Sequence, residues 1–534
     1  MTIKIEDSRI YKAIIVLEAE TPLSIGSGES GLIVDKIVAR DANGLPYLPG
    51  TSIAGVLRNE LENIGFSDID HFFGYQAKDK KGESEGQGSR LYFSSGHLMA
   101  KNGKDVIEGL FLWDKDDEYY RLFDQLPERD HVRIDHKGVS VDGGKFDEEL
   151  VHRGTRFAFS IELEGQEQDK EAWQKLLNQI HAPTFRMGSG TRNGFGKLKV
   201  VSAMQRIFDL TIEKHLKDYL AEPNSLNLDL SNWDTITSHS EAKLEGYHHY
   251  RLQIKPESYF LFGAGFGDDD ADMRPKKERF IVWDDQEGAK LSEPHFLIPA
   301  TSIKGAIAHR VAFHYNQLTG YTLSDAGRVA MQSFPEIDVQ SVFDAFIAKE
   351  NSTSLPEKSD DKRWDAMKAE LNQITVEGLL QTEEWEKQIR RLNTEVEQKE
   401  EGQLAVGENN DAVRTLFGFK REGQNGKRGS VLFSDVYIKE KEASEQVFSH
   451  VKIDRFTGGA SDGALYQEKV ISVQDISFDI YVEDSAFGND KVVKQAFEKT
   501  LDDLVSGRLA LGGNVMKGHG TFHGQVIPQY SQSA

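Results

Sequence analysis

Two short segments of the sequence combine proline, hydroxyl side chains and glycine in a pattern that could hold a phosphate. They read PGTSIAG at residues 49–55 and PATSIKG at residues 299–305. In each, proline ends an extended segment and an apolar-periodic helix follows. The first N–H groups of a helix have no intrahelical partner and therefore attract anions. We expect Ser52 and Ser302 to cap these helices or to donate to a ligand; capping alone, worth about 1 kcal/mol, is the plainer interpretation.

Two glycine-rich segments could also approach a phosphate or a base, because glycine has no Cβ. They are MGSGTRNGFGKLKV at residues 187–200 and LGGNVMKGHGTFHG at residues 511–524. The candidate contacts are Gly188, Gly190, Arg192, Gly194, Lys197, Gly512, Gly513 and Lys517. Neither segment is a Walker A loop, because no Gly-Lys-Ser/Thr follows. Tight turns explain either segment alone, but their paired occurrence favours ligand contact. We expect His519 and His523, with no third ligand in view, to be loop histidines rather than a metal site.

These paired segments belong to a longer internal repeat. The other landmarks are strands that end in GSG (26–28) and GAG (263–265), aromatic-glycine turns within 72–98 and 415–438, and related segments at 133–151 and 452–471. Asp41 and Asp284 each follow an apolar stretch. Because all of these recur in one order, the sequence predicts a tandem duplication.

Each repeat reads as strand, helix, strands, second helix and strand. This order predicts an α+β fold made of two tandem ferredoxin-like domains with additional β-hairpins. We expect a first domain at 1–205, a linker at 206–245 and a second domain at 246–534. The second domain is longer, and helical spacing of apolar residues places a mainly helical insertion at 318–412.

Composition restricts the class of protein. The sequence contains no cysteine, no apolar leader at its start and no apolar run long enough to span a membrane, so we expect a cytoplasmic protein without a membrane partner. The formal net charge of −23 argues weakly against a nucleic-acid partner. A narrow basic groove on an acidic body remains compatible with that charge.

The ordered set LSIGSG, VDKIVARDANGLPYLPGTSIAGVLR, FFG, RIDHKGVSVDGGKFDEELV and GSGTRNGFGKLKV resembles the RAMP (repeat-associated mysterious protein) superfamily. It is most similar to the backbone subunits of type III CRISPR interference complexes. The second half repeats the pattern, so the chain resembles a tandem fusion of two such subunits, as in type III-D systems. The resemblance implies RRM-like domains whose β-hairpin thumbs lie near 133–151 and 452–471. It also implies a ribonucleoprotein with guide RNA, complementary target RNA and other effector subunits as partners.

The resemblance further implies catalytic carboxylates. Asp35 lies where active backbone subunits place the aspartate needed for target-RNA cleavage. Such a carboxylate, with or without Mg²⁺ or Mn²⁺, could orient a 2′-hydroxyl for attack on the adjacent phosphate. In the second half, Glu278 stands six residues before Asp284, as Asp35 stands before Asp41. Glu278, one of Asp269, Asp270 and Asp272, or no residue at all could take the role there.

In relatives, a lysine directly before the last glycine of this segment and an arginine further along contact the guide. The second half has Lys304 and, nearby, Arg310, whereas the first half has Ala54 and Arg58. The leading hypothesis is therefore an RNA-guided endoribonuclease subunit that cuts target RNA at about six-nucleotide spacing. A non-catalytic RNA scaffold and a guide-precursor processing ribonuclease are the alternatives. The sequence places no histidine near the aspartate, which argues against the processing ribonuclease. An acidic protein that binds no RNA is a further possibility.

Overall fold

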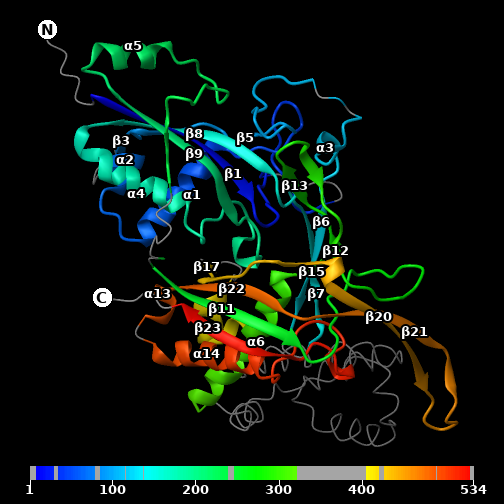
Figure 1. Ribbon diagram of the computed structural model, residues 1–534. Helices are drawn as coiled ribbons and strands as arrows, with labels where there is room; N and C mark the ends of the chain where they lie inside the picture. Colours follow the sequence, from blue (N-terminus) through cyan, green and yellow to red (C-terminus); the bar gives the residue numbers. More distant parts are fainter. Residues whose placement is uncertain are drawn as a thin grey trace, which may run out of the picture.

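The computed structural model describes residues 8–28, 34–78, 84–112, 114, 116–135, 138–237, 244, 246–320, 405–419, 426–488 and 490–529. The chain forms a mixed α/β structure in two halves, which lie one above the other in Figure 1. Most of the predicted insertion at 318–412 lies outside the described residues. Among the helices that are described, none is long and apolar enough to cross a membrane.

The first half is built on an antiparallel sheet of order β10-β9-β1-β8-β4, with β5 also paired to β8. Its strands are β1 (Arg9–Ala19), β4 (Leu91–Phe93), β5 (His97–Leu98), β8 (Arg156–Gly165), β9 (Leu198–Asp209) and β10 (Asp234–Thr235). Helices α1 (Gly50–Asn63), α2 (Ile69–Phe73) and α4 (Lys170–Ile180) pack against it. The segment predicted as a linker contains α5 (Glu213–Ala221) and β10, which extends this sheet.

The second half repeats the arrangement in the order β18-β22-β11-β23. Its strands are β11 (Tyr247–Pro256), β18 (Val431–Leu432), β22 (Ile476–Glu483) and β23 (Phe522–Gln529), and its helices include α6 (Ala300–Leu318), α12 (Asp411–Phe417), α13 (Asp484–Phe487) and α14 (Lys491–Val505). In both halves the strand that begins the half is central: β1 lies between β8 and β9, and β11 lies between β22 and β23. The shared order supports the predicted duplication.

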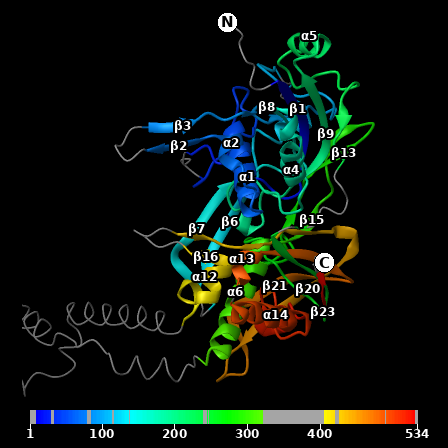
Figure 2. The same ribbon diagram turned by 90° about the vertical axis from the view of Figure 1, so that its left-hand side faces the viewer.

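Each half also carries a long two-stranded hairpin. The first joins β6 (Glu128–Ile134) to β7 (Ser140–Glu149), and the second joins β20 (Ala443–Ile453) to β21 (Ala460–Val473). They coincide with the segments expected to form thumbs. In both views the first hairpin runs from the upper half towards the lower one, and in Figure 1 the second hairpin projects away from the body (Figures 1 and 2).

The remaining elements are short. They are the strands β2 (Tyr75–Lys78), β3 (Ser84–Gln87), β12 (Lys277–Glu278), β13 (Ile281–Asp284), β14 (Gly288–Leu291), β15 (His295–Ile298), β16 (Gly418–Phe419), β17 (Lys427–Arg428) and β19 (Val436–Lys439), the helix α3 (Glu118–Arg121), and 3-10 turns that include η2 (Thr191–Asn193) and η5 (Val515–Lys517). Strands β12, β15 and β19 form a small sheet where the two halves meet.

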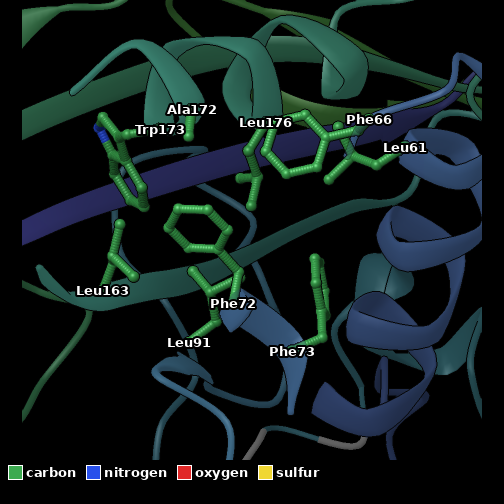
Figure 3. A pocket seen from close by; sticks show the side chains of 9 residues that line it. All are labelled: Leu61, Phe66, Phe72, Phe73, Leu91, Leu163, Ala172, Trp173 and Leu176. Carbon is green, nitrogen blue, oxygen red and sulfur yellow. The ribbon is translucent and has the colours of Figure 1, made fainter. Parts of the chain in front are cut away.

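The core of the first half is apolar and holds no candidate functional residue. Figure 3 shows aromatic and aliphatic side chains from α1, α2, α4 and the sheet converging on a small pocket, among them Phe72, Trp173 and Leu176. Burial of each such side chain stabilises the folded state by about 1.5–3 kcal/mol. The pocket belongs to packing, so the functional site must be sought in the loops and hairpins.

The expected serine caps are wrong. Both helices begin immediately after proline, with Pro49 and Pro299 at the N-cap, and neither has a side-chain cap hydrogen bond from its N-cap residue. Proline fixes φ near the helical value. Because the helices start there, Ser52 and Ser302 lie inside the first turn rather than before it.

Candidate functional site

Asp35 lies on an exposed loop that runs beside the first hairpin. Its backbone N–H donates to Asp147 Oδ1 over 2.9 Å, and the Asp147 N–H donates to Asp35 Oδ2 over 3.2 Å. The next residue, Lys36, forms a parallel β-bridge with Glu148. The loop is therefore fixed to strand β7 while the Asp35 carboxylate stays accessible to solvent.

Beneath this loop, Glu148 is almost fully buried, with 1% of its surface exposed. Ser24 Oγ donates to Glu148 Oε2 over 3.1 Å, His131 Nε2 lies 3.1 Å from Oε1, and Lys36 Nζ lies 3.5 Å from Oε2. Burial alone would raise the pKa of Glu148, but His131, Lys36 and Ser24 outweigh it and lower that pKa. Glu148 thus joins the Asp35 loop, the hairpin and the segment that follows β1 through a charged carboxylate.

The second half contains the same arrangement around Asp272. Met273 bridges to Glu468 in the way that Lys36 bridges to Glu148. The Gln467 N–H donates to Asp272 Oδ2 over 2.7 Å, as Asp147 donates to Asp35. Asp272 is exposed, like Asp35. Asp272 therefore occupies the position equivalent to Asp35.

The bridges show why counting back from Asp284 selected a different residue. Leu23 pairs with Val151 and Gly26 with Val38, whereas Phe260 pairs with Ile471 and Gly263 with Pro275. Leu23 and Phe260, Gly26 and Gly263, Val38 and Pro275, and Asp35 and Asp272 are all separated by the same 237 residues. The second half contains six more residues between this loop and Asp284. They follow Glu278, because the pairing of Lys277 with Phe296 repeats that of Arg40 with Pro46, so Glu278 is the counterpart of Asp41. Counting forward from the glycines at 26–28 and 263–265 gives the correct equivalence of Asp35 and Asp272.

The structure separates the other acidic candidates from this position. Glu278 lies on β12 and accepts two hydrogen bonds from Arg129, at 2.9 and 2.7 Å. Asp270 lies 3.2 Å from Lys469 Nζ, and Asp269 is exposed in the same loop. Only Asp272 makes the contact with the hairpin backbone that Asp35 makes.

Glu468 is the counterpart of Glu148, and it is fully buried. Its partners are His450 at 2.6 Å, His519 at 3.0 Å, Lys517 at 3.1 Å and the Asn514 amide. These contacts outweigh burial and lower the pKa of Glu468. The sequence interpretation missed His131 and His450, which the hairpins bring to the two glutamates. His523 lies in β23 rather than in a loop.

The donor set suggests how a divalent cation would bind. Among the described residues, no three His, Cys, Asp or Glu side chains gather closely enough to hold a metal ion. Mg²⁺ commonly binds through one or two carboxylates together with waters and substrate phosphates. The exposed Asp35, with Asp147 beside it, fits that type of site in the first half. In the second half Gln467 replaces Asp147, which leaves Asp272 as the carboxylate.

The two helix N-termini differ in their surroundings. At α6, the Ala300 N–H donates to Asp435 Oδ1 over 2.8 Å, so a carboxylate already occupies this position. The residue equivalent to Asp435 in the first half is Ser95. The start of α1 therefore lacks that acid and suits a phosphate better. Lys304 donates to Asn193 Oδ1 over 2.9 Å, and burial with the nearby Arg192 lowers the pKa of Lys304 to about 8.

Several predicted RNA-contacting cations have protein partners. Arg58 donates to Asp70, Glu62 and the Gly74 carbonyl, and Arg310 donates to the buried Asp503 over 2.5 Å. These contacts connect helices within each half. Arg310 therefore has a clear structural role in joining α6 to α14.

The glycine-rich loops have the close approach that their sequences suggested. Gly188 has φ +87° and Gly512 has φ +96°, and a Cβ on either would collide with the carbonyl of the equivalent residue, Ser24 or Leu261. Gly190 and Gly194 also adopt positive φ, and Gly513 lies beside Gly512. Lys197 pairs with Glu20, and Lys517 pairs with Glu468 across the Tyr466 ring. Both loops thus lie beside the segment that leads to the exposed aspartate.

The halves meet through an ionic interface. Arg129, 7% exposed, donates to Asp435 over 2.6 Å and to Glu278. Arg186 donates to Ser434 over 2.9 Å, and Arg192 pairs with Glu483. Burial would lower the pKa of Arg129, but Asp435 and Glu278 hold it above its ordinary value. Arg192 and Glu278, both candidate site residues, are therefore part of the junction between halves.

Comparisons with known proteins agree with this duplicated architecture. The model of the RAMP superfamily matches residues 16–199 and again residues 254–523. A curated protein of Methanocaldococcus jannaschii, "CRISPR system Cms endoribonuclease Csm3", is 28% identical over 204 residues, which cover 34% of this chain and 75% of that protein.

Among solved structures, a chain of the "Type III-B Cmr-beta bound to cognate target RNA" shares 13% identity with a TM-score of 0.26. The match covers 38% of this chain and 62% of that one, and it is too weak to carry an argument.

Proposed function

Because the chain belongs to the RAMP superfamily in both of its halves, we propose that it is a double backbone subunit of a type III CRISPR effector. In this role it binds guide RNA and cleaves complementary target RNA, with cuts about six nucleotides apart. The observation that carries the proposal is the equivalent placement of Asp35 and Asp272. Each is an exposed carboxylate fixed to a hairpin by the same backbone contact.

The finer fold assignment is part of this proposal. The strand orders β9-β1-β8-β4 and β23-β11-β22-β18 support two ferredoxin-like domains. We assign hairpins β6–β7 and β20–β21 as the thumbs. A thumb that separates stacked bases would place a splayed nucleotide beside the aspartate at its base. RNA chemistry at single nucleotides favours such unstacked geometry.

The proposed reaction is transesterification. The Asp carboxylate accepts a hydrogen bond from the 2′-hydroxyl of the splayed nucleotide and takes up its proton as the oxygen attacks the adjacent phosphorus. The 5′-oxygen leaves with a proton from solvent, and a 2′,3′-cyclic phosphate remains. Positioned proton transfer of this kind contributes roughly 10²–10⁴-fold to a rate. A divalent cation bound at Asp35 would neutralise charge on the phosphate.

Replacing each aspartate separately tests the proposal. We expect Asp35→Ala to abolish one cut and Asp272→Ala to abolish the neighbouring cut, with guide RNA retained in both variants. The products of a labelled complementary target, mapped at nucleotide resolution, give the result. Asp269→Ala, a change in the same loop as Asp272, should leave both cuts.

If both cuts persist in both aspartate variants, the chain is a non-catalytic scaffold and the assignment is wrong. If Asp269→Ala removes the second cut instead, the register given by the β-bridges does not identify the catalytic residue.

A second candidate, guide-precursor processing, gains one observation from the structure. His450 and His519 lie at Glu468, close in the fold to the Asp272 loop. Their ring nitrogens are engaged with a buried carboxylate, which suits positioning more than proton transfer to RNA. Cutting of repeat RNA without metal, lost in His450→Gln, would favour processing.

A further inference from the structure

The loop that carries Asp272 also carries an exposed aromatic side chain. Phe266 is 80% exposed and lies between Gly265 and Gly267. A Cβ built at Gly267 would lie 2.3 Å from the Ala271 carbonyl oxygen and 2.8 Å from the Asp272 Cα, so the chain at this glycine runs against the chain at the aspartate. The exposed ring of Phe266 is therefore attached one residue away from a close backbone contact with the candidate catalytic residue.

The backbone around Phe266 is fixed by hydrogen bonds. The Asp268 N–H donates to the Ala271 carbonyl over 2.8 Å, and the Ala271 N–H donates to the Asp268 carboxylate over 3.0 Å. The Ala264 N–H donates to the Arg274 carbonyl over 2.9 Å, and Arg274 Nε donates to the Phe266 carbonyl over 3.3 Å. An aromatic ring on a backbone held in this way binds a ligand at little cost in conformational entropy.

Arg274 adds a cation to the same surface. The bridge of Met273 to Glu468 and that of Pro275 to Gly263 hold the segment extended. Side chains alternate along an extended segment, so Asp272 and Arg274 lie on one face of it and Met273 on the other. Asp272 and Arg274 are both exposed. No carboxylate of the described residues pairs with Arg274, whose one side-chain contact is the Phe266 carbonyl.

The acidic run at 268–270 is largely neutralised by the protein itself. Lys469 Nζ lies 3.0 Å from Asp268 Oδ2 and 3.2 Å from Asp270 Oδ2. The ring of Phe266, the guanidinium of Arg274 and the carboxylate of Asp272 remain accessible together. These three groups match the parts of one nucleotide, because aromatic rings stack on bases, guanidinium groups bind phosphate oxygens in pairs and carboxylates accept from hydroxyl groups.

The first half has a different set of residues around its aspartate. At the same spacing of 237 residues, Phe266 corresponds to Glu29 and Arg274 corresponds to Ile37. Glu29 lies outside the described residues, and Ile37 is partly buried. A carboxylate repels phosphate, and an aliphatic side chain has neither a π-face nor a charge. The two halves thus share the aspartate and its backbone contact, whereas the aromatic ring and the arginine belong to the second half alone.

We propose that Phe266 and Arg274 form a nucleotide subsite at the second cutting position. The Phe266 ring stacks on the base of the nucleotide whose 2′-hydroxyl faces Asp272, and Arg274 donates hydrogen bonds to the phosphate on the 3′ side of that nucleotide. The subsite rests on the proposed function and adds a difference between the two cuts, since only the second one depends on a base contact from the protein. Stacking accepts any base, so it leaves recognition by the guide unchanged.

The first test detects the base contact without a cut. A target RNA carries 5-iodo-2′-deoxyuridine directly 5′ to the mapped second cut, where the missing 2′-hydroxyl keeps the strand intact, and the guide-loaded complex is irradiated with this target bound. Mass spectrometry should locate the adduct at Phe266. The same label 5′ to the first cut should give no adduct within residues 23–38. A bound target that gives no adduct at Phe266 would overturn the proposal.

The second test is a double-mutant cycle on the cutting rate. In single-turnover reactions, Phe266→Ala should slow the second cut by about 5- to 150-fold, the range that base–aromatic stacking gives, while the first cut on the same RNA stays unchanged. An abasic nucleotide 5′ to the second cut should slow the native chain by a similar factor and the Phe266→Ala variant no further. Phe266→Tyr should keep the native rate, and Phe266→Leu, which is apolar without a π-face, should behave like Phe266→Ala.

The arginine is tested in the same reactions. Arg274→Gln should slow only the second cut, by about 10-fold or more, because a charge-assisted contact to phosphate is lost. Arg274→Lys keeps a cation and should retain more of the rate. Arg279→Gln changes an exposed arginine five residues further along and should alter neither cut.

The outcomes separate the subsite from the proposed function. If the abasic nucleotide slows the native chain and Phe266→Ala by the same factor, Phe266 does not contact the base and the subsite is wrong, while cuts that depend on Asp35 and Asp272 leave the proposed function intact. Loss of both cuts in the unmodified complex would contradict the proposed function and the subsite with it.

Discussion

Two buried glutamates, Glu148 and Glu468, connect each exposed aspartate to the rest of its half. Each accepts contacts from a hairpin histidine and from residues beside the glycine-rich loop. A carboxylate that is buried and charged requires such partners, because desolvation alone would neutralise it. The precision with which Asp35 or Asp272 is held therefore depends on these hidden residues.

Glu148→Gln should destabilise the first half by roughly 1.5–3 kcal/mol at pH 7, because it removes charge-assisted hydrogen bonds. The folded-state pKa of Glu148 is lowered, so its contribution is present above the ordinary value of 4.5 and is lost as the pH falls through the folded-state pKa. Thermal unfolding at pH 7 and pH 4 measures the effect.

The difference between Glu148→Gln and the native chain should shrink at pH 4. Glu128→Gln, an exposed glutamate on the same hairpin, should leave stability unchanged at both values. A difference that stays constant with pH would mean that Glu148 is not ionised in the folded protein.

At the residue scale, the sequence indicated Asp35 as the catalytic carboxylate of the first half. For the second half it left four candidate carboxylates, or none. The choice depended on where the six additional residues lie, and spacing from a single landmark cannot locate an addition. The β-bridges of Gly26 and Gly263 locate it after Pro275. The contacts of His131 with Glu148 and of His450 with Glu468 could not be predicted, because these two histidines come from the other strand of each hairpin.

Among the elements, hairpin β6–β7 has two roles, since its base carries both the contact to Asp35 and Arg129. Arg129→Met should cost roughly 3–5 kcal/mol, because it leaves the buried Asp435 and the partly buried Glu278 without their cation. Limited proteolysis and thermal unfolding should show the two halves separating at lower temperature.

Phe448→Met, the equivalent change on the second hairpin, should leave the junction between halves intact. If Arg129→Met unfolds at the same temperature as the native chain, the ionic junction contributes nothing to the stability of the pair. The sequence could not reveal this junction, since Arg129 and Asp435 lie far apart along the chain and neither belongs to a recognised motif.

Considered as a whole molecule, the protein is strongly acidic, with a formal net charge of −23. RNA affinity must then come from local cations. Lys517 lies in a glycine-rich segment, where it is exposed although it also pairs with Glu468. Lys517→Ala should weaken guide binding and reduce the slope of log affinity against log salt by about 1. Arg310→Ala should lower stability and leave that slope unchanged, because Arg310 joins α6 to α14 through the buried Asp503 and does not lie in a glycine-rich segment.

Filter-binding titrations at several salt concentrations compare these two variants. An equal loss of slope in both would mean that Arg310 contacts RNA despite its partner. The duplication itself was predictable, because it rests on many landmarks in one order. The way the halves contact each other was not, because it depends on residues that differ between them.

The loops from Leu23 to Val38 and from Phe260 to Pro275 have kept the same length, although the chain around them has gained residues. Each is anchored at both ends by the same bridges to its own half. Each loop is therefore a unit that can be replaced by the other. The two loops could be exchanged between halves without altering chain length or register, so the cutting properties of one position could be transplanted to the other.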